Sequence, residues 1–298
     1  MPNDLYAEIT DKLVALMEAD PQNPQLPWRR SGIPLTIPAN ATTHQPYNGI
    51  NILSLWMAGE QHGFTTPLWA TYRQWAAAGA HVRRGEKASL VIFYKEYETN
   101  PNPDDTDDNG KRRVARASHV FNAAQVDGFE VPAPTDKLNP IDRIAAVETF
   151  IANTGATIRI SGDRAYYRPS TDEIVMPEEH LFTGTDTMTR SQAFYAVELH
   201  EGIHWSGALT RLNRQFGKRF GDDAYAFEEL VAELGASFLC AELQITQAAR
   251  PDHAHYLANW LHVLKNDKRA LFHAAAKAAE AVTYLKSLQK QPGLLAAE

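Results

Sequence analysis

The sequence contains almost no cysteine and no long apolar run. Its single cysteine, Cys240, lies among apolar neighbours in a chain of 298 residues. An intramolecular disulfide is therefore excluded, and the thiol is expected to be a small buried group. No segment approaches the roughly 20 apolar residues that a membrane-spanning helix needs, and acidic residues scattered through positions 1–20 do not fit a signal peptide. These absences predict a soluble protein of the cytoplasm with no membrane partner.

The chain also lacks an overall basic charge. It has 29 Lys and Arg residues against 36 Asp and Glu residues, for a net charge of −7, so any surface that binds nucleic acid must be local. Hydrophobic residues make up 44% and charged residues 22% of the chain, which is ordinary for a globular protein. The length favours two domains, each large enough to bury a core of its own.

Hydrophobic periodicity and turn residues predict an α+β protein with two domains. The first, at residues 1–130, is expected to be an α/β domain with a β-hairpin. Its expected helices and strands cover residues 4–18, 50–60, 67–78 (with Thr66 as N-cap), 89–97 and 114–121. The second, at residues 141–298, is expected to be mostly helical, with a small sheet whose strands cover residues 157–161, 164–168 and 173–176. A linker at residues 131–140 contains closely spaced prolines, which stiffen such connections.

The second domain contains an HExxH sequence, His200-Glu201-Gly202-Ile203-His204, within a stretch of helical periodicity. Positions four apart on a helix differ by about 40° around its axis, so both imidazoles leave the same face and can reach one ion. Glu201 directly follows the first histidine and is placed to act as a general base on an attacking water molecule. The pattern predicts a metal site of the zinc-peptidase type with Glu201 as its catalytic residue.

A site of this type needs a third protein ligand. A histidine six residues after His204, as in metzincins, is excluded because position 210 is threonine. The following helix offers Glu229 and Glu233, which share a face, so that one can bind the ion while the other hydrogen-bonds a ligand histidine. The arrangement resembles the thermolysin-like gluzincins, whose second helix carries Asn-Glu-x-x-x-Asp. That resemblance implies Glu229 as the ligand and Glu233 as the orienting carboxylate; the sequence departs from the pattern at Glu228 and Glu233.

Two histidines and a glutamate favour one zinc ion, with manganese as the alternative divalent metal. Its role remains open, because HExxH helices also occur in proteins that use the metal for structure alone. A peptide substrate is expected to lie along an edge strand, for which residues 172–177 are the candidate because they form a short strand ended by Pro177. A metal-dependent nuclease is disfavoured, since such enzymes are rich in carboxylate ligands.

Basic and acidic residues are segregated in the first domain. Residues 21–95 contain seven basic and two acidic residues, residues 111–119 add four basic ones, and residues 96–108 contain six acidic ones. Aromatic residues are interleaved with the basic ones, as in surfaces that bind single-stranded nucleic acid by stacking and phosphate contact. The tryptophans with helical spacing are expected in the core: Trp56, Trp69 and Trp75. The candidate nucleic-acid contacts are Trp28, Arg29, Arg30, Tyr47, Asn48, Arg73, Arg83, Arg84 and Lys87.

Several short strings occur in a recognisable order along nearly the whole chain. They are residues 27–30 (PWRR), 47–51 (YNGIN), 69–74 (WATYRQ), 79–87 (GAHVRRGEK), 120–122 (VFN), 174–177 (IVMP), the HExxH sequence, 211–212 (RL) and 228–235 (EELVAELG). In this order they resemble the ArdC-type plasmid antirestriction proteins. The resemblance implies a single-stranded-DNA-binding N-terminal domain and a zincin-like metallopeptidase C-terminal domain. It also implies protection of incoming conjugative DNA, with a host restriction component as a further partner. The alternative is a single-stranded-DNA escort protein whose metal domain is a structural or docking module.

Overall fold

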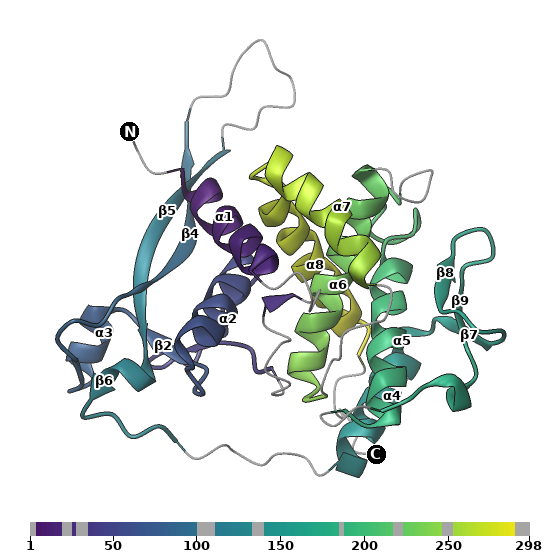
Figure 1. Cartoon of the computed structure of the whole chain (residues 1–298), viewed down its shortest axis with the longest axis horizontal. Coiled ribbons are helices and arrows are strands. Elements are labelled where there is room, and N and C mark those ends of the chain that lie inside the picture. Colours follow the sequence, from purple (N-terminus) through teal and green to yellow (C-terminus); the bar gives the residue numbers. More distant parts are fainter. Residues whose placement is uncertain are drawn as a thin grey trace, which may run out of the picture. The chain divides into compact units, whose positions relative to one another are not determined.

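The computed structural model of the chain describes residues 4–19, 26–27, 35–99, 111–132, 140–184, 188–216, 223–245 and 253–289. Its contacts divide the chain into two compact units. The small unit is Pro38–Pro132, and the large unit is Met1–Ile37 together with Ala133–Glu298. Each unit contains both helices and strands (Figure 1), which confirms the α+β class predicted from the sequence.

The N-terminal helix belongs to the large unit, whereas the sequence pattern placed it with the domain at residues 1–130. Helix α1 (Leu5–Glu18) begins at Asp4, whose carboxylate accepts hydrogen bonds from backbone N–H groups of the first turn. The Thr10 hydroxyl donates to the carbonyl of Lys268, 2.8 Å away, and α1 contacts helix α7 (His253–Asn266) of the same unit. The apolar face of α1 therefore has its packing partners in the C-terminal half of the chain.

A mixed sheet runs through the small unit. Its strands, in spatial order, are β1 (Ala39–Asn40), β2 (Leu68–Ala70), β5 (Lys111–Asn122) and β4 (Ser89–Glu98). β4 and β5 pair antiparallel from Ser89 opposite Val120 to Glu98 opposite Lys111, and Figure 1 shows them as a long twisted ribbon. This β4–β5 ribbon is the predicted hairpin, with strands longer than the sequence pattern indicated. A second, short antiparallel pair consists of β3 (His81–Val82) and β6 (Val126–Asp127).

Helix α2 (Ile50–His62) covers one edge of β4. It starts after Gly49, whose φ of 54° and ψ of −127° define a backbone conformation that glycine adopts readily and residues with a side chain rarely adopt. The Asn51 side chain accepts a hydrogen bond from the backbone N–H of Ile92 at 2.7 Å and donates one to its carbonyl at 2.8 Å. The Ser54 hydroxyl donates to the carbonyl of Leu90 at 2.7 Å. These side chains take the place of a neighbouring strand along the first part of β4.

The prediction of a helix at residues 67–78 is only partly correct. Its first part forms β2, between β1 and β5, and helix α3 covers Tyr72–Ala77. The N-cap is Thr71 rather than Thr66: the Thr71 hydroxyl accepts from the backbone N–H of Gln74, and the Gln74 side chain accepts from the backbone N–H of Thr71. This capping box fixes the start of the helix, while pairing on both sides of β2 outweighs the helical periodicity of the preceding residues.

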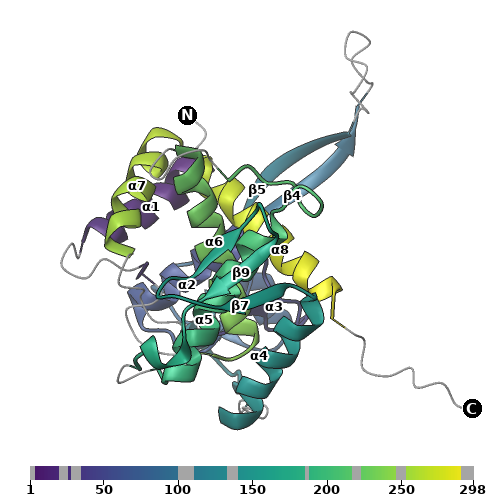
Figure 2. The same ribbon diagram turned by 90° about the vertical axis from the view of Figure 1, so that its right-hand side faces the viewer.

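The large unit consists of helices beside a small sheet. After α1, its helices are α4 (Pro140–Thr154), α5 (Arg190–Ser206), α6 (Asp223–Glu242), α7 (His253–Asn266) and α8 (Ala270–Ser287). α6 is buried along most of its length and contacts α5, α7 and α8. Cys240 lies on α6 and is buried, as predicted. Figure 2 shows the strands of the sheet in front of α5.

Strand β9 (Glu173–Met176) lies in the centre of this sheet, so the prediction of an edge strand at residues 172–177 is wrong. β9 pairs in parallel with β7 (Thr157–Ile160) and antiparallel with β8 (Tyr166–Arg168). The order β7-β9-β8 puts β7 and β8 at the edges, and β8 contacts α5. The edge strand beside the helix that carries HExxH is therefore β8.

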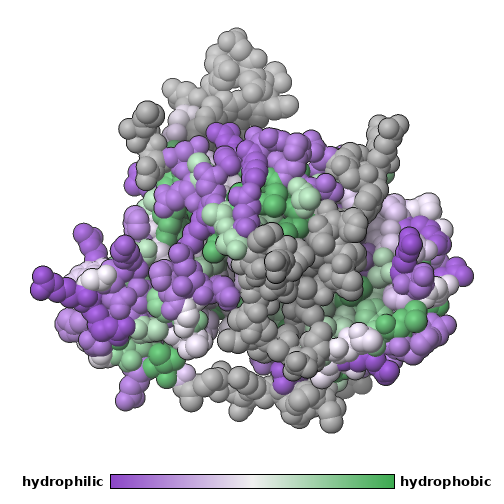
Figure 3. All heavy atoms as spheres, viewed as in Figure 1, coloured by the Kyte–Doolittle hydropathy of each residue, from purple (hydrophilic) through white to green (hydrophobic). Residues whose placement is uncertain are grey.

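Hydrophobic side chains are concentrated inside the two units. The tryptophans expected in the core of the small unit, Trp56, Trp69 and Trp75, are all buried. On the face shown in Figure 3, hydrophilic residues predominate among those that are coloured. Within the described ranges, no helix has the length and apolar character that crossing a membrane requires.

Candidate metal centre

Helix α5 starts with a capping box and brings both histidines of the HExxH sequence to one face. The Thr189 hydroxyl accepts from the backbone N–H of Gln192, whose side chain accepts from the backbone N–H of Thr189. One turn apart near the other end of α5, the imidazole rings of His200 and His204 have centroids 4.9 Å apart and planes inclined at 76°. Both side chains are buried. The rings therefore converge, as their spacing predicted.

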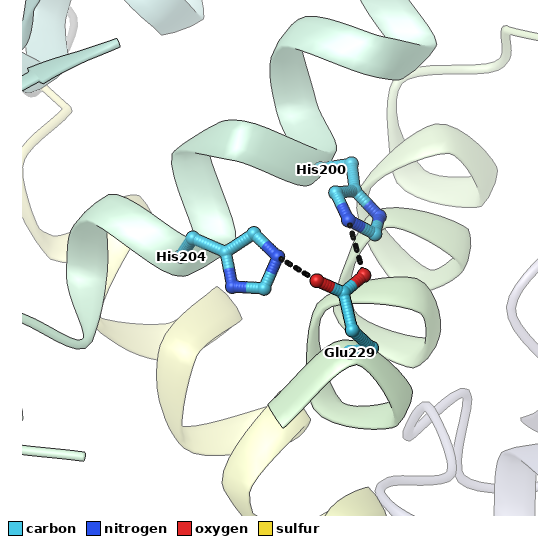
Figure 4. Close-up of side chains that lie close together, drawn as sticks. All are labelled: His200, His204 and Glu229. Carbon is cyan, nitrogen blue, oxygen red and sulfur yellow. Dashed lines mark ion pairs between the residues drawn. The ribbon is translucent and has the colours of Figure 1, made fainter. Parts of the chain in front are cut away.

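The Glu229 carboxylate, from α6, lies between the two rings (Figure 4). Its Oε2 is 3.5 Å from Nε2 of His200, and its Oε1 is 3.5 Å from Nε2 of His204. Two ligand atoms at zinc-ligand distances from one tetrahedral ion lie roughly 3.4 Å apart, so these separations fit a single ion held by all three side chains. Among the residues that the structure describes, these three form a group whose ligand atoms all lie within 4.8 Å of one another.

A glycine on α6 allows the two helices of the centre to approach closely. A Cβ atom at Gly235 would lie 2.7 Å from Cδ1 of Ile203, a distance that no side chain tolerates without a shift of its neighbours. Ile203 directly precedes His204 in α5, and Gly235 is less than two turns from Glu229 in α6. The absence of a side chain at Gly235 therefore helps to set the separation between the histidine pair and the glutamate.

Each histidine faces a second carboxylate through its other ring nitrogen. Nδ1 of His200 lies 3.4 Å from Oε2 of Glu233, and Nδ1 of His204 lies 3.2 Å from Oε1 of Glu228. Such carboxylates fix the tautomer and the orientation of metal-binding imidazoles. Glu229 is thus the glutamate that faces both Nε2 atoms, while Glu233 occupies the orienting position. Sequence reasoning missed Glu228 as the partner of His204, although its departure from the gluzincin asparagine marked the position.

Negative charge is concentrated around the two imidazoles. Burial alone would lower the pKa of His204, but the charge of Glu229 and the hydrogen bond to Glu228 raise that pKa to about 10. Burial alone would raise the pKa of Glu229, yet the positive charge on the histidines holds it well below its ordinary value. Glu201 is 3% exposed, and its charge also acts on His204. These charges favour a cation between the side chains, and a divalent metal ion suits the donor set.

Two family models match consecutive parts of the chain. Residues 3–124 match the N-terminal domain of anti-restriction factor ArdC, and residues 145–277 match a zincin-like metallopeptidase. The metal-free crystal structure of the antirestriction ArdC protein from plasmid R388 is similar over 96% of this chain and 98% of that one, with 34% identity and a TM-score of 0.76. The chain belongs to the ArdC antirestriction family.

Relatives of this ArdC-family chain differ in length. The Mn(II)-bound ArdC structure from plasmid R388 has a TM-score of 0.75 and 33% identity, over 96% of this chain and 98% of that one. Protein y4eC of Sinorhizobium fredii is 41% identical over 293 residues, which are 97% of this chain and 93% of that protein. A DNA primase TraC of Escherichia coli is 36% identical over 304 residues, covering 96% of this chain but 27% of the primase. A similar sequence therefore also forms part of a longer protein.

The candidate nucleic-acid contacts of this ArdC-family chain fall into three groups. Those outside the described residues are Trp28, Arg29 and Arg30. Those exposed on the small unit are Asn48, Arg73, Arg84 and Lys87. Of the remaining two candidates, Tyr47 is buried in the small unit and Arg83 is paired with acidic side chains of the same unit.

Tyr47 and Arg83 are both engaged by the fold of the small unit. Tyr47 is 8% exposed, so its ring lies in the core and does not present a face on which a base can stack. The guanidinium of Arg83 donates to Glu86 at 2.9 Å and to Asp127 at 3.4 Å, and it thereby ties the loop before β4 to β6. Of the neighbouring pair, the exposed Arg84 is the better candidate for a phosphate contact.

The outer part of β4 exposes aromatic residues that the sequence pattern did not single out as stacking candidates. Phe93 and Tyr94 are adjacent and each is 50% exposed, and Tyr97 is also exposed. Successive residues of a strand point to opposite faces, so beyond the buried Ile92 neither face of the ribbon is covered by the core. Phe93 lies opposite the exposed Arg116 in the register of the ribbon. An exposed aromatic ring and an exposed basic side chain thus lie side by side on one face.

Proposed function

We propose that this chain is an antirestriction protein that holds one divalent metal ion and binds single-stranded DNA through its N-terminal half, residues 1–130. The observation that carries the metal site is the Glu229 carboxylate, 3.5 Å from Nε2 of both His200 and His204. Zinc suits two histidines and a glutamate, and the Mn(II)-bound structure of the relative supports manganese as the alternative. In this role the protein acts in the cytoplasm, where incoming DNA meets host restriction components.

The number of ligands favours a hydrolytic role. Structural zinc sites are closed by four protein ligands, whereas catalytic sites have three and leave a position open. In the described part of the chain, the ligand group comprises His200, His204 and Glu229. A divalent ion bound there supplies Lewis acidity toward a peptide carbonyl. The buried Glu201 takes a proton from the attacking water molecule and delivers it to the leaving amine.

The edge of β8 supplies a place for an extended peptide. β8 (Tyr166–Arg168) is the edge strand that contacts α5, and Tyr166 is exposed on it. A peptide that added a strand to this edge would gain backbone hydrogen bonds beside the helix of the metal centre. β8 therefore replaces residues 172–177 as the strand that aligns a substrate.

Replacement of Glu201 by Gln tests whether the centre is hydrolytic. Glu201 is outside the ligand group, so Glu201→Gln should leave the affinity for Zn²⁺ and for single-stranded DNA within about 2-fold of wild type. Loss of a general base should lower hydrolysis by about 100-fold or more. The matched control is His204→Ala, which removes a ligand and should abolish both metal binding and hydrolysis.

Transfer of a plasmid encoding each variant into restricting and non-restricting recipients distinguishes the two functions. The hydrolytic proposal expects Glu201→Gln and His204→Ala to lose protection equally in restricting recipients. Full protection by Glu201→Gln, together with loss of protection by His204→Ala, would contradict hydrolysis. That outcome would favour the alternative function, a DNA escort protein whose metal domain is structural or a docking module.

Exposed aromatic rings and exposed basic side chains on the small unit support the DNA-binding part of the proposal. Phe93, Tyr94 and Tyr97 are exposed on the ribbon, and the exposed Lys95 and Arg116 lie on the same strands. Single-stranded binding surfaces combine such rings, which stack on bases, with cations that contact phosphates. In a competition assay, a single strand of about 30 nucleotides, enough to span several stacking positions, should displace a labelled single strand at a lower concentration than duplex DNA of the same sequence. Equal competition by the duplex would contradict a stacking surface.

A further inference from the structure

Arg214 is a buried arginine beside the metal centre that the proposed hydrolytic chemistry does not use. It is 8% exposed and lies between α5 and α6. Arg214 contacts Glu228 of α6: its Nε donates to Oε2 at 3.0 Å and its Nη2 donates to Oε1 at 2.9 Å. Arg214 also contacts the end of α5, where its Nη1 donates to the Ser206 hydroxyl at 2.9 Å and its Nη2 donates to the carbonyl of Ile203 at 2.5 Å. Arg214 therefore joins the end of the histidine helix to the helix that supplies Glu229.

The contact between Arg214 and Glu228 determines how His204 is held. The two-pronged contact occupies both carboxylate oxygens and fixes their plane. Oε1 of Glu228 then lies 3.2 Å from Nδ1 of His204. Because an ionised carboxylate only accepts hydrogen bonds, Nδ1 is the nitrogen that donates. The other nitrogen, Nε2, faces Glu229 at 3.5 Å and is the one left to bind an ion.

Arg214 also balances a charge that the gluzincin pattern lacks. Where that pattern has a neutral asparagine, this chain has Glu228, a buried carboxylate next to Glu229. A buried carboxylate without a cationic partner is strongly disfavoured. The guanidinium of Arg214 supplies the partner, so the negative charge of Glu228 is available to orient His204.

The structure makes room for this guanidinium at Gly207. A Cβ atom at Gly207 would lie 2.8 Å from Nη2 and 2.9 Å from Cζ of Arg214. The φ of Gly207 is −82°, which any residue adopts, so its backbone conformation does not require glycine. The backbone N–H of Arg214 also donates to the carbonyl of Gly207 at 2.8 Å. The ring of Phe216 is equally close, with Cζ 2.9 Å from the same Cβ position. Glycine at this position is therefore explained by the close approach of the Arg214 and Phe216 side chains.

We infer that Arg214 is a positioning residue of the metal centre: it holds Glu228 so that His204 presents Nε2 to the ion. The inference rests on the proposed metal site, which His200→Ala tests separately. The probe is Zn²⁺, with its affinity measured on the full-length chain by competition with a chromophoric chelator. The absorption spectrum of the Co²⁺-loaded protein serves as a second readout, since it reports the geometry of the ligands.

The variants are Arg214→Met, Glu228→Gln and the double variant that combines them. Arg214→Met should weaken Zn²⁺ binding by about 10- to 100-fold, as expected when a partner of a ligand histidine is lost, and should change the Co²⁺ spectrum. In the double variant the unpaired carboxylate is gone, so Zn²⁺ should bind at least about 3-fold more tightly than in Arg214→Met alone. If Arg214 only anchors the end of α5, the double variant would bind as weakly as Arg214→Met.

Arg211→Met is the matched control. Arg211 lies in the same connection, but it donates to the carbonyl of Trp205 at 2.6 Å and to Asp172 at 3.0 Å rather than to Glu228. This variant should therefore keep wild-type affinity for Zn²⁺. If Arg214→Met does not fold, Arg214→Lys, which keeps the charge without the fork, should bind Zn²⁺ with an affinity below that of wild type.

Three results would overturn the inference. The first is an affinity of Arg214→Met, or of Arg214→Lys where that variant replaces it, within about 2-fold of wild type. The second is equal weakening by Arg211→Met, and the third is a double variant no tighter than Arg214→Met. Failure of the proposed metal site gives a different pattern: the wild-type chain would not bind Zn²⁺, or His200→Ala would bind it as tightly as wild type.

Discussion

Removal of one exposed ring from the β4–β5 ribbon should weaken single-stranded DNA binding without changing its salt dependence. Phe93 is 50% exposed, so Phe93→Ala removes a stacking face and little of the core. Stacking of a base on an aromatic side chain contributes about 1–3 kcal/mol. At 25 °C this range corresponds to a loss of affinity of about 5- to 150-fold.

Loss of a phosphate contact, unlike loss of a stacking ring, should change the salt dependence of DNA binding. Apart from Arg83, which is paired with Glu86, the exposed basic side chains that the structure describes on the small unit are Arg73, Arg84, Lys87, Lys95 and Arg116. If all of these contact phosphates, the affinity should depend on salt with a log–log slope of about −3.5, at roughly 0.7 per contact. An increase in salt from about 50 to 200 mM should then weaken binding by about 100-fold. Arg116→Ala should reduce the slope to about −2.8.

Fluorescence anisotropy of a labelled oligothymidine, titrated at several salt concentrations, measures both quantities. Tyr166→Ala is the matched control, because Tyr166 is an exposed ring on the large unit. Wild-type affinity for Phe93→Ala, or a change in its salt slope, would refute a stacking role. Equal weakening by Tyr166→Ala would show that the effect is not specific to the ribbon.

Three further predictions concern the large unit. Chelation of a metal held at about 1,000 times its Kd removes about 4 kcal/mol of stabilisation, so EDTA should lower the unfolding temperature in calorimetry by roughly 8–16 °C; no shift would contradict the site. Gly235→Ala should weaken Zn²⁺ binding, since the new Cβ would meet Cδ1 of Ile203 at 2.7 Å, and adding Ile203→Val should recover part of the loss. Burial and the hydrogen bond to Asp172 raise the pKa of Tyr167 to about 12, so its neutral form should contribute stability that is complete below about pH 10 and is lost as pH rises through about 12. Tyr167→Phe should flatten that loss in thermal unfolding, and a phenol that titrates near its ordinary pKa of about 10 by NMR would contradict it.

The parts of the metal centre that depend on local spacing could be predicted from the sequence. His200 and His204 share a helix face by geometry alone. Spacing within the next helix left Glu229 and Glu233 as alternatives, and the resemblance to the gluzincins favoured Glu229. The pairing of Glu228 with His204 could not be predicted, because it depends on the ring orientation and on Arg214, which lies in the connection between the two helices. Contacts of that kind are set by tertiary structure.

Strand order and surface exposure were the least predictable features of the fold. Residues 172–177 have the composition of a strand, but long-range pairing with β7 and β8 decides that β9 is central. Tyr47 is an aromatic residue in the basic stretch at residues 21–95, yet it packs in the core, whereas Phe93 on β4 is half exposed. Burial of an aromatic ring depends on what covers it, and the sequence of the strand does not specify that.

A crystal structure of the metal-loaded chain, with anomalous scattering recorded at the absorption edge of the metal, tests the metal centre most directly. We predict one ion about 2.0–2.2 Å from Nε2 of His200, Nε2 of His204 and a carboxylate oxygen of Glu229. Glu233 and Glu228 should remain on the Nδ1 atoms of the two histidines. An anomalous peak elsewhere, or an ion bound by Glu233 in place of Glu229, would contradict this assignment.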